Sequence, residues 1–277
     1  MMKRKYNFTV LIFLLIGPMV IKAQSNPDFT LASNGVTCLC PNANFGDTGT
    51  LTINSESKTF TKRTRAQLDS IIDSSYYADD PQIALTCTTG ITDMSTLFLS
   101  ENGFDQNIES WDVSNVTDMR SMFISAGSFN QPLNNWDVSN VTDMRNMFRN
   151  AGSFNQPLNN WNVSSVTQME RMFDSAQSFN QPLNNWDVSN VSDMNRMFLK
   201  AKDFNQPLSN WDVSNVTSML YMFSETQSFN GDISGWDISS VTDMNGMFRD
   251  ASDFNQPLNT WDTSSVTNMF RMFDNAY

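Results

Sequence analysis

Tryptophan recurs at a fixed interval in this chain, and that interval constrains the fold more than any other feature. The seven tryptophans each lie 25 residues from the next: Trp111, Trp136, Trp161, Trp186, Trp211, Trp236 and Trp261. A period of about 20 to 50 residues is typical of stacked repeats, in which each unit covers the apolar face of its neighbour. Such arrays present a long surface rather than one pocket, so the period favours a protein that binds a partner.

The period also divides the chain into regions. Six complete units occupy residues 111–260, and an incomplete seventh unit occupies residues 261–277. Residues 86–110 fit the same frame with Thr86 in place of tryptophan, as expected of a degenerate first repeat. Residues 24–85 differ in composition and are predicted to cap the first coil, with an independent binding domain as the alternative. Since the array stops within a unit, we expect the chain to be a fragment of a longer protein.

Two periodicities alternate within each unit. In the unit that starts at Trp136, apolar and polar residues alternate through Ser139, which predicts a short strand. Met144, Met147, Phe148 and Ala151 then follow the spacing of one helix face. A return loop should follow the helix. The sequence therefore predicts an α/β repeat solenoid of short strand, short helix and return loop, with methionine as a core residue rather than a copper ligand.

The beginning of the chain has the features of a signal peptide. Residues 1–23 combine a basic start with an apolar run that is shorter than the roughly 20 residues a membrane span needs. The sequence thus predicts export, to the medium or the cell surface, with no membrane insertion after cleavage. The remaining chain carries 13 basic and 29 acidic side chains, a net charge of −16, and no histidine. Such acidity argues against nucleic acid as a partner.

Three cysteines lie in the N-terminal third of the chain. Export makes a disulfide plausible, and the natural pairing joins Cys87 to either Cys38 or Cys40. Free thiols are the alternative. The C-x-C pair of Cys38 and Cys40 could suggest a metal site, but two thiolates without histidine are too few for a closed zinc site, so no metal site is predicted here.

One outward column of the predicted strand is acidic. Its aspartates are Asp112, Asp137, Asp187, Asp212, Asp237 and Asp262, with Asn162 in the remaining unit. Each acid could accept hydrogen bonds from the backbone two residues on, or from the serine there. Alternatively, the row could bind calcium or basic groups of a partner. Asn162 favours hydrogen bonding, since an amide keeps the acceptor and loses the charge.

The helix positions vary from unit to unit, and variable positions are candidates for partner binding. Leu220 and Tyr221 are apolar where the pattern expects polar residues, and exposed apolar clusters can mark contacts. The candidate arginines in these columns are Arg145, Arg171 and Arg196. The asparagines of the N-V-T and N-V-S triplets match a glycosylation sequon, but they recur with the turn and are interpreted as structural.

The repeat W-D-V-S-N-V-T-D-M, followed by M-F, A and F-N-Q-P-L, resembles that of the BspA-like leucine-rich-repeat surface proteins of bacteria. The likeness covers residues 86–277, and the leader with residues 46–65 resembles the cap that such proteins carry. It implies a leucine-rich-repeat-like solenoid at the cell surface, adhesion in some members, and no catalytic residues.

The sequence therefore predicts a non-enzymatic, exported protein whose solenoid binds a protein or cell surface. No cofactor is predicted, apart from calcium as a candidate ligand of the acidic row. A glycan-binding module and a purely structural cell-envelope protein are the alternatives. A hydrolase would need acids or a nucleophile that converge outside the repeat pattern, and the sequence offers no such set.

Overall fold

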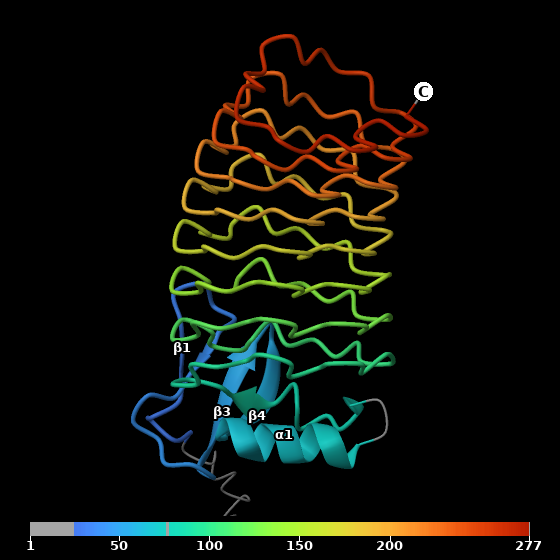
Figure 1. Cartoon of the computed structure of the whole chain (residues 1–277). Coiled ribbons are helices and arrows are strands. Elements are labelled where there is room, and N and C mark those ends of the chain that lie inside the picture. Colours follow the sequence, from blue (N-terminus) through green and yellow to red (C-terminus); the bar gives the residue numbers. More distant parts are fainter. Residues whose placement is uncertain (1–24, 76–77, 277) are drawn as a thin grey trace, which may run out of the picture.

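The computed structural model describes residues 25–75 and 78–276, and the predicted signal peptide lies outside them. The chain begins in a cap of short strands and one helix, and continues as a pile of coils whose long axis runs away from the cap (Figure 1). One apolar core runs through the coils, and it includes Leu68 and Ile72 of the cap helix. Leu68 and Ile72 thus place the cap helix against one end of the coil core.

The cap is built from two small sheets and a helix. Strands β1 (Thr30–Leu31) and β2 (Cys38–Leu39) pair antiparallel. Strands β3 (Thr48–Ile53) and β4 (Glu56–Lys62) form a hairpin, and β5 (Thr86–Cys87) adds to β4 in parallel. Helix α1 (Arg65–Ser74) begins with a capping box between Thr64 and Gln67, which satisfies free N–H groups of the first turn. The hairpin lies where residues 50–61 show a β-rich alternation, and the helix lies where residues 65–72 show a helical pattern.

A disulfide joins the cap to the start of the coils. Of the two partners considered for Cys87, the structure pairs it with Cys40. Cys38 is a buried free thiol, and burial, with a smaller effect of Asp112, raises its pKa to about 12. A thiol with this pKa stays protonated at neutral pH, whereas the thiolate is the reactive form.

The coils themselves contain neither the strand nor the helix that the sequence predicts. Within the described residues, α1 is the sole helix, and the M-x-x-M-F segments consist of successive turns. In the coil after Trp111, Met122 N donates to Met119 O, which closes a turn, whereas Ser121 N and Phe123 N donate to carbonyls of the next coil. Met94 N and Met119 N, each one residue after a parallel bridge position, likewise donate to the next coil, at Asp118 O and Asp143 O. Backbone N–H groups that bond between coils cannot form helical bonds within one, which explains the difference.

The turns depend on residues in the left-handed conformation. Two such residues occur in each coil, for example Ser121 with φ of 62° and Ser125 with φ of 58°. In other coils these positions hold large side chains, including Arg171, Arg196 and Tyr221. A positive φ costs free energy in residues other than glycine, so the inter-coil bonds must hold these turns in place.

Identical side chains stack on one another through the core. Phe173 lies between Phe148 and Phe198, with ring centroids 5.6 Å apart on both sides and rings within 7° of parallel. The indoles of Trp161 and Trp186 stack at 6.3 Å. Every tryptophan from Trp111 to Trp236 is at most 3% exposed, and each indole N–H donates to a carbonyl 28 residues earlier, as Trp161 does to Leu133 at 2.9 Å. The expected burial of the indoles is confirmed.

We expect Phe173→Ala to lower the free energy of unfolding by about 3–5 kcal/mol, because the substitution leaves a cavity between two rings that cannot move together. Phe270→Ala is the matched control, since this ring is 62% exposed, and its effect should be within about 0.5 kcal/mol. Urea unfolding followed by circular dichroism measures both. Equal effects of the two substitutions would contradict a core built by ring stacking.

Candidate functional site

The acidic column forms a row of Asx turns along the coil stack. The Asp187 Oδ1 atom accepts from Ser189 N at 3.1 Å and from Ser189 Oγ at 2.6 Å. The same pair of bonds recurs in four other coils, at Asp112, Asp137, Asn162 and Asp212. The geometry therefore gives each residue of the row a structural role that needs one oxygen acceptor.

The second carboxylate oxygen of these aspartates has no such role. Within the described part of the chain, Oδ2 of Asp137, Asp187 and Asp212 accepts no hydrogen bond from the protein. These side chains are exposed, in contrast to Asp112, which the cap buries to 4% exposure. The exposed acids thus present one unused, negatively charged oxygen per coil to solvent.

Asparagines flank the acids, and most of them are anchored by hydrogen bonds between coils. The sequon residues Asn140, Asn190 and Asn215 each donate from Nδ2 to a serine carbonyl of the preceding coil at 2.7–2.8 Å. A second ladder starts at Asp105 and continues through the asparagine of each F-N pair, whose Oδ1 accepts from the next coil, as Asn130 does from Asn155 N at 2.9 Å. These asparagines are therefore structural, as the sequence predicts for those of the sequons.

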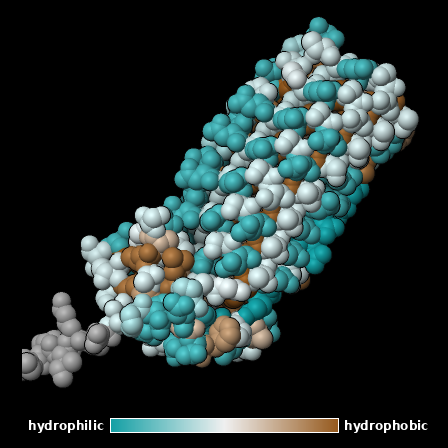
Figure 2. Space-filling view, turned by 90° about the vertical axis from the view of Figure 1, so that its left-hand side faces the viewer, coloured by the Kyte–Doolittle hydropathy of each residue, from teal (hydrophilic) through white to brown (hydrophobic). Residues whose placement is uncertain are grey.

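Shallow hollows recur between the acids and the amides. One hollow of about 350 Å³ is lined by Asn184, Asn185, Asp187, Asn210 and Asp212, with the edge of Trp186. An equivalent hollow of about 290 Å³ lies beside Trp136, two coils nearer the cap, where Asn34 of the cap adds to its wall. Rows of hydrophilic side chains that repeat along the stack are visible in Figure 2. We call the acidic row and the amides of these hollows the acid–amide face.

Basic residues are nearly absent from the coil segments that make this face. Eight of the nine lysines and arginines in residues 86–277 lie in the segments of successive turns: Arg120, Arg145, Arg149, Arg171, Arg196, Lys200, Arg249 and Arg271. Lys202 is the ninth. The acid–amide face therefore carries uncompensated negative charge, whereas the turn segments mix both signs.

The turn segments use most of the predicted partner-binding residues internally. Arg145 forms a two-pronged ion pair with Asp143, with the shortest distance at 2.6 Å, and Arg171 lies 3.4 Å from Glu170. The Arg196 guanidinium lies over the Tyr221 ring at 5.6 Å from its centroid. A Cβ atom at Gly246 would collide with the same ring from the next coil. Tyr221 is thus packed between coils, and Leu220 beside it is half-buried.

The described residues contain no group of three or more histidine, cysteine, aspartate or glutamate side chains arranged to hold a metal ion. The acids of the row stand one per coil, and each uses one oxygen for its own turn. Calcium binding by the row stays a prediction.

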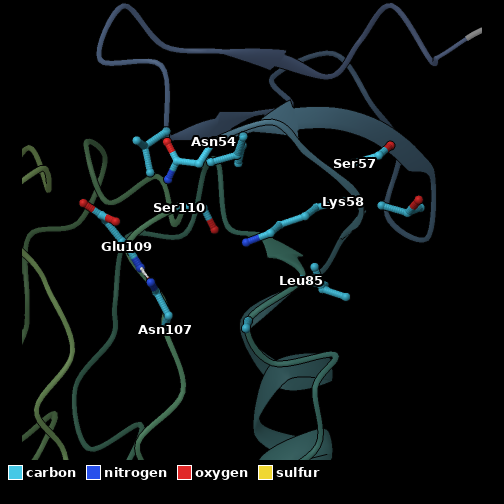
Figure 3. A pocket seen from close by; sticks show the side chains of 11 residues that line it. Asn54, Ser57, Lys58, Leu85, Asn107, Glu109 and Ser110 are labelled. Carbon is cyan, nitrogen blue, oxygen red and sulfur yellow. Dashed lines mark hydrogen bonds between the residues drawn. The ribbon is translucent and has the colours of Figure 1, made fainter.

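The sequence gives no warning of a third feature, a cavity of about 360 Å³ between the cap hairpin and the first coil (Figure 3). Its walls come from the β3–β4 hairpin, from residues 84–85 and from residues 107–110. Lys58 extends into it from β4, with its amine directed toward Asn107 and Ser110. Lys58 shares its strand face with Glu56, the buried Phe60 and the buried Lys62, so the alternation of β4 does not mark the cavity.

Comparison with known families shows what the chain is similar to. A model described as "Mycoplasma protein of unknown function, DUF285" matches residues 71–186 and 176–277, which run from α1 through the coils. The chain belongs to this family. Comparison with curated proteins finds no match. Among the described residues, no helix is long and apolar enough to cross a membrane.

Replacement of Asp187 should separate the effect of its hydrogen-bond acceptor on stability from the effect of its charge. We expect Asp187→Asn to change the free energy of unfolding by less than about 0.5 kcal/mol, because an amide oxygen can accept both bonds from Ser189, as Asn162 does from Ser164. Asp187→Ala removes the acceptor and should cost about 0.5–1.5 kcal/mol. Urea unfolding of both variants checks this, and an asparagine variant as unstable as the alanine variant would argue for a role of the charge in folding.

The Asx turns also predict how stability depends on pH. Hydrogen bonds from Ser189 lower the pKa of Asp187, and bonds from Ser239 and Ser264 lower the pKa of Asp237 and Asp262. A folded-state pKa below the unfolded value of about 3.9 gives a contribution that is complete above that value and is lost as pH falls through the folded pKa. Thermal melts from pH 6 to pH 2 should show this loss of stability. A variant with Asp187→Asn, Asp237→Asn and Asp262→Asn should lose less stability over the same range. Identical profiles for the two proteins would contradict the assignment.

Proposed function

We propose that this chain is a non-catalytic protein that is exported to the cell surface, where its coil stack binds a partner protein or another cell surface. In this proposal the stack is a leucine-rich-repeat-like solenoid of the BspA type. The resemblance of the W-D-V-S-N-V-T-D-M repeat and the signal-like residues 1–23 support that assignment.

The observation that carries the proposal is the regular spacing of the acid–amide face. It offers a free carboxylate oxygen at Asp137, Asp187 and Asp212, with amide groups beside the row and Asn162 in the coil after Asp137. Neighbouring strands in parallel pairing lie about 4.8 Å apart, and the parallel bridges tie the coils at such positions. Each exposed carboxylate contributes little by itself, but a partner that contacts many coils at once gains from effective concentration.

The charge of this face defines the chemistry of the partner. Negative groups without intervening lysine or arginine attract basic side chains and accelerate encounter with them at low ionic strength. A protein surface with rows of lysine or arginine fits the face better than nucleic acid or an anionic membrane, which it repels.

A glycan is the second candidate, and one observation favours it. The hollow at Trp186 combines two carboxylates, three amides and an indole edge, which are groups that can bind sugar hydroxyls. The indole face itself is stacked against Trp161 and is not open to a sugar ring. This is why we place protein binding first.

The test compares the wild-type chain with a variant in which Asp137, Asp187, Asp212 and Asp237 are all asparagine. Immobilised protein is exposed to surface-protein extracts of host matrix and of neighbouring bacteria at low and high salt, with and without calcium. We expect captured proteins to bind the wild type at least ten times more tightly than the variant, and to be released by salt, because the variant keeps the turns and loses the charge.

The matched control converts four exposed acids outside the row, Asp73, Asp79, Asp203 and Asp253, to asparagine, which changes net charge equally. Equal loss of binding in the control variant would reduce the proposal to a general charge effect. Saturable binding on a glycan array that survives high salt would instead favour the glycan reading. If the wild type binds only in the presence of calcium, and the asparagine variant shows no such requirement, the acidic row is a calcium site.

A further inference from the structure

Strand β4 has a partner along the whole of one edge and along only part of the other. All of β3 pairs with it on one side, from Thr48↔Thr61 to Ile53↔Glu56. On the other side β5 covers only Thr61 and Lys62. The chain before β5 turns away, because Ile83 N bonds to Asp80 O and Leu85 N bonds to Pro81 O. The first half of β4 therefore lacks a neighbour where the sheet could continue.

The direction of the unpaired backbone groups follows from the alternation of an antiparallel pair. Lys62 N donates to Asp47 O on the β3 side, whereas Thr61 N donates to Leu85 O on the β5 side. Counting back by two from Thr61, the N–H and C=O groups of Thr59 and Ser57 point to the β5 side as well. Within the described residues, no backbone group of the protein bonds to them there.

The cavity between the hairpin and the first coil lies at this open edge. Ser57, Thr59 and Leu85 all line it, so it occupies the position of the missing strand (Figure 3). Val36, Ile53 and Leu85 give it apolar walls, and its volume of about 360 Å³ lies in the range of sites that hold ligands. An exposed strand edge beside apolar walls is the geometry of peptide recognition by strand addition.

The charged residues that line the cavity determine which extended peptides fit it. Lys58 is the one basic residue that lines the cavity. Its ion pair with Glu56 spans 3.4 Å and is solvent-exposed, with the Glu56 side chain 72% accessible, so the amine remains free for another anion. The other charged residue of the cavity, Glu109, accepts a 2.6 Å hydrogen bond from Asn135. A peptide with an acidic side chain near Lys58 therefore fits better than a basic one.

We propose that the open edge of β4 binds an extended, acidic peptide segment of a partner protein, which adds as a strand beside Ser57 and Thr59 with its carboxylate at Lys58. This site is separate from the acid–amide face and does not rest on the function proposed for that face. The two sites require partners of opposite charge, so they bind different segments.

The experiment measures fluorescence anisotropy of a labelled peptide, Thr-Val-Glu-Val-Thr, with the full chain. The comparison peptides carry lysine in place of glutamate, or N-methyl groups on alternate residues, which remove the donors needed for pairing. We expect the acidic peptide to bind saturably and at least tenfold more tightly than either comparison peptide. Absence of saturable binding at millimolar protein, or equal binding of all three peptides, would overturn the proposal.

Two proline variants test the edge itself. Thr59→Pro removes an N–H that points into the cavity and leaves the bonds to β3 intact. Thr50→Pro is the matched control, because it lies directly opposite on β3, points to the other edge of the hairpin and loses the same 2.9 Å bond between the Thr50 and Thr59 hydroxyls. We expect at least tenfold weaker binding for Thr59→Pro and unchanged binding for Thr50→Pro, with equal melting temperatures. Equal binding by both variants would overturn strand addition.

Charge reversal at Lys58 provides a readout that a folding defect would not produce. We expect Lys58→Glu to prefer the lysine peptide over the glutamate peptide, and Lys58→Met to bind both equally. An unchanged preference for the acidic peptide in Lys58→Glu would show that the peptide binds elsewhere. Concentration-dependent dimerisation that blocks the peptide would identify a second copy of this chain as the occupant of the edge and would also overturn the proposal.

Discussion

The structure depends on backbone hydrogen bonds that run from one coil to the next. A coil of 25 residues has no helix or long strand of its own, so its buried N–H and C=O groups have to be satisfied by its neighbours. Those bonds fix the register, because a shift by one residue would misplace every pair. Register then places like on like, and the phenylalanine and tryptophan stacks follow. The 25-residue period thus follows first from the hydrogen bonds between coils, and the side-chain stacks follow from the period.

This dependence explains what sequence reasoning could and could not predict. The period and the apolar positions predict that the coils stack and that the indoles are buried, and the indoles from Trp111 to Trp236 are buried. The predicted helix is absent because Met144, Met147, Phe148 and Ala151 also reach the core when two consecutive turns replace one helical segment. Glycine would have signalled the left-handed positions, but they hold residues such as Arg171 and Tyr221, which inter-coil bonds keep in that conformation.

The two candidate sites also differ in how far the sequence predicts them. The acidic row is readable from the sequence because it repeats, and its Asx turns follow from the serine two residues after each acid. The open edge of β4 does not repeat. It exists because residues 81–85 turn away before they reach the hairpin, and no local pattern shows where a chain will leave a sheet. Lys58 does not mark it either, because Glu56 and Lys62 are also charged residues on the same face of β4.

Asn162 shows which property of the acidic row the fold requires, the hydrogen-bond acceptor or the charge. Its amide oxygen accepts the same two bonds from Ser164 that each neighbouring aspartate accepts from its own serine, so the turn requires an acceptor and not a charge. The aspartates of this row repel one another. Bonds from Ser239 lower the pKa of Asp237, while the charge of Asp262 in the next coil raises it. Six of the seven positions nevertheless carry aspartate. Because a row of asparagines would satisfy the turns without this repulsion, the retained charge supports a role for the acidic row outside the fold.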